Sequence, residues 1–435
     1  YEIGVRLVGS EMCIRDRAVL AKGLCERIGI DGRLVYQKTG LDKEITEAAM
    51  PTHKQAIQMV LDALVNEKTG AIKSLKEVDA IGHRVVHGGE KFAASAVITD
   101  VKTGDVLACV SYPGYDNNRL VNNMDTDYYA KLSTDKSSPF FNKATQQTAA
   151  PGSTFKILST IAGMSEGVID DGTYINCTGS FDLVTPPINC WNKQGHGEIE
   201  IREAIEQSCN YYFNMVGFKL GQDADGNFSE NRSLSVLQKY ASEIGLDKKT
   251  GIEITESAPH VSDSYAVPSY IGQGTNAYTT SQLARYATAI ATSGNVYDLT
   301  LLDRQTDSKG NTLKKYEPDI INTVDVSQNV WDDIHDGMYR VVQTHRQFDG
   351  LGVDVAGKTG TAEVNIYHPN HGMFVGYAPA SDPEYAIAVR IENGYTSGNA
   401  CLAADDIFKY IFELTDEKSI LTGVAASDTS DTSND

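Results

Sequence analysis

The sequence lacks long hydrophobic runs and an excess of positive charge. No stretch of about 18 consecutive apolar residues occurs in it, so a membrane-spanning helix is not expected. The N-terminus also lacks the apolar core of a signal peptide. A formal net charge of −20 argues against binding to nucleic acid and against attraction to anionic lipid. With 435 residues, 41% hydrophobic and 22% charged, the composition is typical of a soluble globular protein with two or three domains.

Paired cysteines are absent as well. The seven cysteines are scattered without C-x-x-C spacing, so the sequence predicts no metal site and no disulfide framework, and no cofactor is expected. Cys177 and Cys190 flank a loop with glycine and proline, and their pairing would require an oxidising compartment. His368 and His371 have H-x-x-H spacing in a turn with proline and asparagine, which favours a surface loop before a strand over a metal site. Cys209 has no histidine close in sequence and is expected to be a small buried packing residue.

What is present is a serine at the start of an apolar helix. Residues 150–156 read APGSTFK, and the apolar positions that follow recur at helical spacing. Lys156 would therefore lie one turn after Ser153 on the same face. A neutral lysine amine can take the proton of a serine hydroxyl, and the free N–H groups of a helix N-terminus stabilise developing negative charge. The stretch thus predicts a nucleophile, its base and an oxyanion donor within one turn.

Two further short motifs gain meaning only from their context. S-x-N and K-T-G each occur five times. Only Ser208–Asn210 lies among dense apolar and aromatic residues, and only Lys358–Gly360 lies in a buried-strand pattern, VAGKTGTAEV. The second S-x-x-K, at Ser133, is rejected because its STDK loop is polar and has no helix to orient the lysine. The selected motifs follow the order S-x-x-K, S-x-N, K-T-G that is typical of penicillin-binding proteins and serine β-lactamases.

Periodicity gives a coarse map of the remaining elements. Apolar stripes predict helices over 18–28, 52–66, 198–216, 278–293 and 403–414. Apolar and alternating runs predict a hairpin over 96–111 and strands at 78–86, 355–363, 373–378 and 385–392. The polar, acidic residues 418–435 predict a disordered tail.

The N-terminal part has a different character from the rest. Residues 1–17 show no amphipathic period, resemble a translated sequencing adapter in part, and are interpreted as a non-native leader outside the fold. Residues 18–92 resemble the N-terminal part of acetate kinases in the segments VLAKGLCERIGIDG, MPTHKQAIQMVLDALV and IGHRVVHGGEKF. In that family the HRVVHGGE segment lines the active site, and Arg84 matches the substrate-binding arginine. The phosphate-binding opening and the nucleotide half of the family have no counterpart, so no phosphoryl transfer is expected, and His83, Arg84 and His87 are expected to be locally satisfied groups.

From Ala96 to about Leu414 the chain resembles the transpeptidase domain of class B penicillin-binding proteins. The resemblance is carried by APGSTFK, IREAIEQSCNYYFNMVG, VAGKTGTAE and FVGYAPASDPEYAIAVRIENG. It implies an α/β fold with an antiparallel five-stranded sheet flanked by helices and a helical subdomain, the active-site serine lying between them. The expected organisation is a leader (1–17), an acetate-kinase-like fragment (18–92), a transpeptidase domain (93–417) and an acidic tail (418–435).

The resemblance also implies the roles of the acylation residues. Ser153 would attack the penultimate D-Ala carbonyl of a peptidoglycan stem peptide and form an acyl-enzyme. Lys156, with a pKa lowered by burial and nearby positive charge, would be the base. Ser208 would relay a proton to the leaving amine, and Asn210 would hold the substrate amide.

The K-T-G strand would complete the substrate site. Lys358 would supply positive potential, and Thr359 with Thr361 would bind the terminal carboxylate. The backbone N–H groups of Ser153 and Thr361 would form the oxyanion hole. Gly357 and Gly360 would leave room for the ligand to approach this strand.

The partners implied by the family are stem peptides on lipid-linked or nascent glycan, β-lactams, and a glycosyltransferase of the elongation or division machinery. The family acts at the extracytoplasmic face of the bacterial cell membrane, although no anchor or signal is visible in this sequence.

Alternative functions stay open at this point. A β-lactamase is disfavoured because no E-x-x-L-N pentad occurs between Tyr211 and Val355, and because Cys209 replaces the aspartate of S-D-N. A penicillin sensor or a D,D-carboxypeptidase would carry the same three motifs. The joined character of the chain leaves an inactive chimeric fragment, or a remnant of acetate kinase, as further alternatives.

Overall fold

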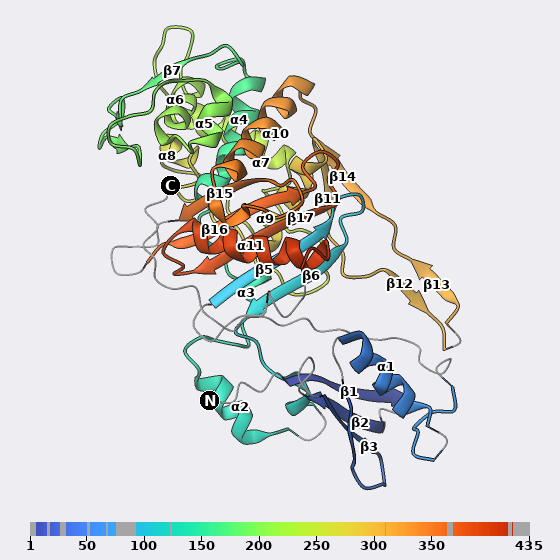
Figure 1. Cartoon of the computed structure of the whole chain (residues 1–435). Coiled ribbons are helices and arrows are strands. Elements are labelled where there is room, and N and C mark those ends of the chain that lie inside the picture. Colours follow the sequence, from blue (N-terminus) through green and yellow to red (C-terminus); the bar gives the residue numbers. More distant parts are fainter. Residues whose placement is uncertain are drawn as a thin grey trace. The chain divides into compact units, whose positions relative to one another are not determined.

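The computed structural model describes residues 6–14, 18–26, 32–49, 53–66, 68–74, 93–121, 124–308, 310–362, 369–415 and 420. The chain divides into two compact units (Figure 1). Unit 1 comprises Tyr1–Arg84, Asp116–Asp125 and Arg304–Lys315, and unit 2 comprises Val85–Tyr115, Thr126–Asp303 and Tyr316–Asp435. Within the described residues, no helix has the length and apolar character needed to cross a membrane.

Unit 1 is built on a four-stranded antiparallel sheet in the order β1-β2-β3-β4. A small apolar cluster of Ala21, Leu34, Tyr36 and Ala56 joins the sheet to helix α1. The bounds of these elements are β1 Arg6–Ile14, β2 Ala18–Glu26, β3 Arg33–Lys38, β4 Glu44–Glu47 and α1 His53–Leu64; the unit also contains η2 Asn117–Arg119 and the hairpin β12 Arg304–Thr306 and β13 Thr312–Lys315.

One prediction for unit 1 is wrong. The helix predicted over 18–28 is strand β2, which pairs with β1 in the segment interpreted as a leader. Gly23 disfavours a helix by about 1 kcal/mol relative to alanine, and pairing with β1 and β3 on both sides outweighs a short apolar stripe. The helix predicted over 52–66 is confirmed as α1. The strand predicted at 78–86, with its two histidines and Arg84, lies outside the described residues.

Unit 2 is organised around a five-stranded antiparallel sheet in the order β15-β16-β17-β5-β6, which confirms the predicted fold class. The sheet joins the two ends of the unit, because β5 pairs with β17 in the register Ile98 opposite Ile387. Its strands are β5 Ala93–Asp100, β6 Val106–Tyr112, β15 Ala356–Ala362, β16 His371–Ala378 and β17 Tyr385–Glu392. All five lie where strands were predicted from periodicity.

The two faces of this sheet belong to two separate apolar clusters. Successive residues alternate between them: Phe374 and Ile387 belong to the cluster that contains residues of α11, whereas Val375 and Ala388 belong to the larger cluster that contains residues of α9. This is the period of two that side chains follow along a strand. Helices α9 (Thr280–Ala291) and α11 (Ser397–Ile411) therefore cover opposite faces of the sheet (Figure 1).

Most other elements of unit 2 form a helical region beyond strand β15. The predicted helix 198–216 is two helices, α5 and α6, with a break at Ser208, whereas the predicted helix 278–293 is confirmed as α9. The acidic tail 418–435 lies outside the described residues except for Ile420. The remaining bounds are α2 Thr126–Thr134, α3 Lys143–Gln146, η3 Gly152–Phe155, α4 Lys156–Ser165, β7 Ile175–Cys177, β8 Ser180–Phe181, β9 Ile188–Asn189, β10 Gly197–Ile199, α5 Ile201–Glu206, α6 Asn210–Leu220, α7 Glu230–Glu243, α8 Ala266–Ser269, β11 Asn295–Asp298, β14 Asp319–Thr323, α10 Gln328–Gln343 and η4 Arg346–Phe348.

A buried arginine on β17 ties the sheet to the segment that leads into η3. The guanidinium of Arg390 donates hydrogen bonds to the carbonyl oxygens of Lys143 at 3.0 Å, Gln147 at 2.7 Å and Tyr278 at 3.3 Å. We expect Arg390→Met to lower the free energy of unfolding by about 3 kcal/mol or more, because it removes three hydrogen bonds from a charged donor to buried carbonyl oxygens. Urea denaturation of the full chain measures this, with the exposed Arg346→Met as the matched control. Equal effects of the two substitutions would contradict the prediction.

Candidate active site

Ser153 lies on a tight turn whose backbone is pressed against strand β15. The turn enters η3 through Gly152, which has a φ of +53°. A Cβ at Gly152 would come within 2.7 Å of the carbonyl oxygen of Thr361, and one at Gly360 within 2.9 Å of Cγ2 of Thr154. Only glycine permits these approaches. The S-x-x-K serine and the K-T-G strand are therefore in direct backbone contact, and Ser153 itself remains partly exposed.

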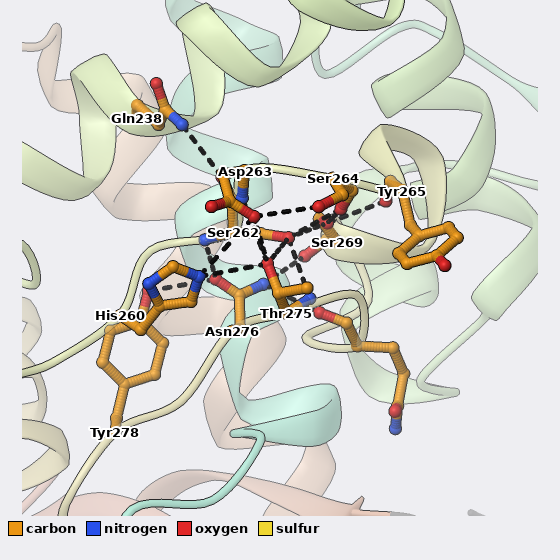
Figure 2. Close-up of polar contacts among 11 residues, drawn as sticks. Gln238, His260, Ser262, Asp263, Ser264, Tyr265, Ser269, Thr275, Asn276 and Tyr278 are labelled. Atoms are coloured by element: carbon orange, nitrogen blue, oxygen red, sulfur yellow. Dashed lines mark hydrogen bonds and ion pairs between the residues drawn. The ribbon is translucent and has the colours of Figure 1, made fainter.

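The loop before α9 holds this turn from another side. Gly152 N–H donates to the carbonyl oxygen of Gly272 at 3.1 Å, and Ala149 and Tyr278 exchange backbone hydrogen bonds of 3.0 and 2.9 Å. Within the loop, the buried Ser262 and Asn276 are joined by a 3.0 Å hydrogen bond in the network that Figure 2 shows. The side chains in this network fix the loop, and the loop in turn fixes both ends of the serine turn.

A tyrosine on α9 anchors the start of α4. The N–H of Leu158 donates to the hydroxyl of Tyr286 at 2.8 Å, and that hydroxyl donates to the carbonyl oxygen of Thr154 at 3.3 Å. Tyr286 is completely buried, and burial raises the pKa of its hydroxyl well above the usual value, so this donor stays protonated. The first turn after Ser153 is thus held at backbone groups on either side of Lys156.

Lys156 is completely buried and joins the S-x-x-K motif to the S-x-N motif. Its Nζ donates to Oγ of Ser208 at 3.1 Å, to the carbonyl oxygen of Ser208 at 2.6 Å and to Oδ1 of Asn210 at 2.7 Å. The ring of Phe213 lies 5.7 Å from the same nitrogen. Three of the residues predicted from the sequence therefore form one hydrogen-bonded group.

The S-x-N motif is positioned by the break between α5 and α6. Ser208 has a φ of +51°, in the left-handed region, and its N–H donates to the carbonyl oxygen of Ile205 as α5 ends. Cys209 then caps α6, because its Sγ accepts a hydrogen bond from the N–H of Tyr212 at 3.4 Å. The break turns Ser208 Oγ and Asn210 Oδ1 toward the same lysine. A continuous helix, as predicted over 198–216, would not do this, since residues two apart lie on different sides of a helix.

The K-T-G motif lies on β15, the edge strand of the sheet. Lys358 is completely buried, and its Nζ donates to the carbonyl oxygen of Thr359 at 3.2 Å. A Cβ at Gly357 would come within 2.2 Å of the ring of Phe374. The reason for glycine at 357 and 360 therefore differs from the expected one: protein packing, against Phe374 and Thr154, already excludes a side chain at both positions.

Ser208 and Thr359 line one cavity of about 280 Å³, together with Trp191, Asn192, Glu206 and His345. This cavity brings the S-x-N and K-T-G motifs to one solvent-accessible space. A larger hollow of about 450 Å³ is lined by Lys239, Ser242, Glu243 and Asn322 and contains none of the motif residues. The rejected Ser133 lies in the last turn of α2, although its loop was expected to contain no helix, and its side chain and that of Lys136 are exposed.

The fold gathers a group of thiols and a histidine beside the S-x-N motif that the sequence did not indicate. The ligand atoms of Cys177, Cys190, His196 and Cys209 all lie within 4.8 Å of one another. Nδ1 of His196 is 3.5 Å from Sγ of Cys177 and 3.6 Å from Sγ of Cys190. Three thiols and an imidazole at this spacing fit the tetrahedral sulfur and nitrogen ligand set of zinc. The spacing along the chain is irregular, and the only signal was the density of cysteine and histidine between 177 and 209.

Hydrogen bonds within this cluster shift the pKa values of its thiols and its imidazole in different directions. Hydrogen bonds from Cys209 and from His196 hold the pKa of the Cys190 thiol below its usual value. Burial lowers the pKa of His196, but hydrogen bonds to Cys190 and Cys177 outweigh burial and raise it. Cys177 and Cys190, whose pairing was left open, are both free thiols. His371, the other candidate ligand within the described residues, is buried in β16, where its Nδ1 accepts the N–H of Asn393. His368 lies outside the described residues.

Comparison with known proteins gives two family matches. Residues 94–413 match the penicillin binding protein transpeptidase domain family, and residues 8–134 match the acetokinase family. The matches overlap over 94–134, but β5 and β6 lie in the five-stranded sheet of unit 2.

Individual relatives follow the same division. A peptidoglycan D,D-transpeptidase MrdA from Acinetobacter baumannii is 29% identical over 72% of this chain and 50% of its own length. An acetate kinase from Agathobacter rectalis is 79% identical over 21% of this chain and 23% of its own length. The penicillin G acyl-enzyme complex of penicillin-binding protein A from M. tuberculosis has a TM-score of 0.63 and 26% identity, covering 74% of this chain and 75% of that one. The chain thus spans about half the length of the first relative and about a quarter of the second.

The thiol and histidine cluster is expected to bind one zinc ion per chain, because its donors match the preferred ligands of that metal. Cys190→Ser removes one of them and should abolish most of the bound zinc, whereas Cys109→Ser, outside the cluster, should not. Metal analysis of reduced, gel-filtered protein measures the ratio. Equal zinc content in the two variants would rule the site out.

Proposed function

The chain belongs to the penicillin-binding protein transpeptidase domain family, and from that premise we propose that it is a serine-type peptidoglycan D,D-transpeptidase. The substrate would be a D-Ala-D-Ala stem peptide, which acylates Ser153, releases its terminal D-Ala and is then transferred to the amine of a second stem. The observation that carries this proposal is the contact of the buried Lys156 with Ser208 and Asn210, one turn after Ser153.

In the proposed mechanism, Lys156 reacts as a neutral amine. Its two N–H bonds are directed at the carbonyl oxygen of Ser208 and at Oδ1 of Asn210, and its lone pair accepts the proton of the Ser153 hydroxyl as Oγ attacks the substrate carbonyl. The 3.1 Å contact between Nζ and Ser208 Oγ then provides the path by which a proton reaches the leaving amine. Asn210 holds the substrate amide through the part of its side chain that does not accept from Lys156. A second amine attacks the acyl-enzyme by the reverse proton path and forms the cross-link.

Strand β15 supplies the remaining groups. As an edge strand, it presents backbone groups that β16 does not use to the side where the serine turn lies. The N–H groups of Ser153 and Thr361 would stabilise the oxyanion, in line with the approach of Gly152 to Thr361. Thr359 and Thr361 would bind the terminal carboxylate, and the buried charge of Lys358 would favour that anion.

The proposal extends to organisation and location. The transpeptidase domain would comprise residues 93–417 and would act on stem peptides at the outer face of a bacterial cell membrane, beside a glycosyltransferase of the elongation or division machinery. β-Lactams would acylate the same serine; penicillin-binding protein A from M. tuberculosis is described as forming an acyl-enzyme complex with penicillin G. The acetokinase-like segment would contribute no phosphoryl transfer, since it corresponds to 23% of an acetate kinase.

Ser153→Ala should abolish covalent labelling by penicillin, because no other group in the proposed site would form the ester. Intact-mass spectrometry of the full chain after incubation with penicillin should give one adduct per molecule for the unmodified protein. The matched control is Ser133→Ala in the exposed second S-x-x-K motif, which should label fully. An unmodified, folded protein without an adduct would favour the inactive chimera, and an adduct that hydrolyses within seconds would favour a β-lactamase.

Lys156→Met should slow acylation by about 100-fold to 10,000-fold, the usual contribution of a general base. Methionine fills a similar volume, so the apolar packing of α4 is retained. The rate of labelling by a fluorescent penicillin measures the effect, and Lys136→Met, exposed in the second motif, is the control. Similar rates for the two variants would remove Lys156 from the mechanism.

A further inference from the structure

We propose that Cys190 and Cys209 form an oxidation-sensitive thiol pair whose conversion to a disulfide switches off the neighbouring acyl-transfer site. The inference rests on the proposed function, because its output is the reactivity of Ser153. Its input is a separate feature of the fold, the group of thiols between β7 and α6.

The two sulfur atoms are already close. Sγ of Cys190 lies 4.0 Å from Sγ of Cys209, and Sγ of Cys177 and Nδ1 of His196 lie within the same 4.8 Å group. A disulfide bond is about 2.05 Å long, so pairing requires the two sulfurs to approach by roughly 2 Å. His196, which contacts Cys190, also lines the cavity shared by Ser208 and Thr359, so a small oxidant in that cavity is one side chain away from the thiols.

Cys209 transmits this movement because it stands inside the S-x-N motif. In the reduced protein its Sγ accepts the N–H of Tyr212 and caps α6. The residues on either side make the contacts of 2.6 to 3.1 Å with Lys156. A shift of Cys209 toward Cys190 removes the cap from α6 and moves Ser208 out of its left-handed conformation. A displacement of about 1 Å in a catalytic group is enough to cost about 100-fold in rate.

The chemistry balances with a peroxide as the two-electron oxidant. Cys190 gives its thiol proton to Nδ1 of His196, and the resulting thiolate attacks one peroxide oxygen. The O–O bond breaks, and the leaving hydroxide takes that proton back from His196 to become water. Cys190 is then a sulfenic acid. The thiol of Cys209 attacks its sulfur, the S–O bond breaks, and the hydroxyl leaves as water with the proton of Cys209. A dithiol reverses the step by exchange through the Cys190–Cys209 bond.

The environment of Cys190 suits it to be the first thiol oxidised. Its Sγ lies 3.6 Å from Nδ1 of His196, which can take the thiol proton, and 4.0 Å from Sγ of Cys209. A base and a second thiol therefore lie beside Cys190, as the two steps require. Outside the cluster, burial raises the pKa of Cys109 to about 11, which disfavours its reaction.

The test uses the full chain, reduced and freed of bound metal, and exposes it to increasing hydrogen peroxide. Acylation by a fluorescent penicillin should fall by about 100-fold as peptide mapping shows a disulfide between Cys190 and Cys209, and dithiothreitol should restore both. Cys190→Ser should keep its acylation rate through the same treatment. Cys109→Ser, the matched control, should lose it as the unmodified protein does. If Cys190→Ser does not fold, Cys190→Ala replaces it in the test, after circular dichroism has shown that this variant is folded.

Three outcomes would overturn the inference: a Cys190–Cys209 disulfide with unchanged acylation, loss of acylation in the folded Cys190 variant as well, or a mapped disulfide that excludes Cys209. A failure of the proposed function is distinguishable, since the reduced protein would then not be acylated before any peroxide is added. Peptide mapping does not depend on acylation, so it shows in either case whether Cys190 and Cys209 form a disulfide.

Discussion

The arrangement of this site depends on the buried amine of Lys156, which must be hydrogen-bonded. A lysine removed from water costs several kcal/mol unless its hydrogens find acceptors, and here the acceptors come from a segment 52 to 54 residues further along the chain. The backbone of that segment directs these acceptors toward Lys156: α5 ends, Ser208 takes a left-handed conformation, and α6 begins at a cysteine cap. On the opposite side, glycines let the serine turn touch β15. Helix α4 and the turn before it therefore contact both the S-x-N motif and the K-T-G strand.

Much of this was predictable from local pattern. The strands over 373–378 and 385–392 could be predicted from their apolar runs. Both faces of the sheet are buried, so successive residues of these strands all face an apolar cluster. The contact of Lys156 with Ser208 and Asn210 followed from motif order combined with context. What local pattern missed depends on contacts between distant residues. The break at Ser208 cannot be seen in an apolar stripe that continues through it. The four donors of the thiol and histidine cluster come from strand β7, the residue after β9, the residue before β10 and the cap of α6.

In the N-terminal unit, too, strand pairing could not be predicted from local pattern. Residues that carry no amphipathic signal form β1, and a weak helical stripe forms β2, because each supplies the other with hydrogen-bond partners. Unit 1 holds most of the acetokinase-like sequence together with two short segments of the transpeptidase match. Its small apolar cluster is separate from the two clusters of unit 2. The roles assigned to the active-site residues depend only on contacts made within unit 2.

The pairing of β5 with β17 also determines when the five-stranded sheet can form during synthesis. The first strand of unit 2 finds its neighbour only in Tyr385–Glu392, near the other end of the chain. During synthesis the ribosome must release Tyr385–Glu392 before the sheet can close, and contacts this distant in sequence make folding slow. Until then β5 and β6 can form only a two-stranded hairpin, which is marginally stable in water by itself. A translation product that stops before β17 therefore has no complete sheet, and β15 has no fixed edge on which the serine turn can rest.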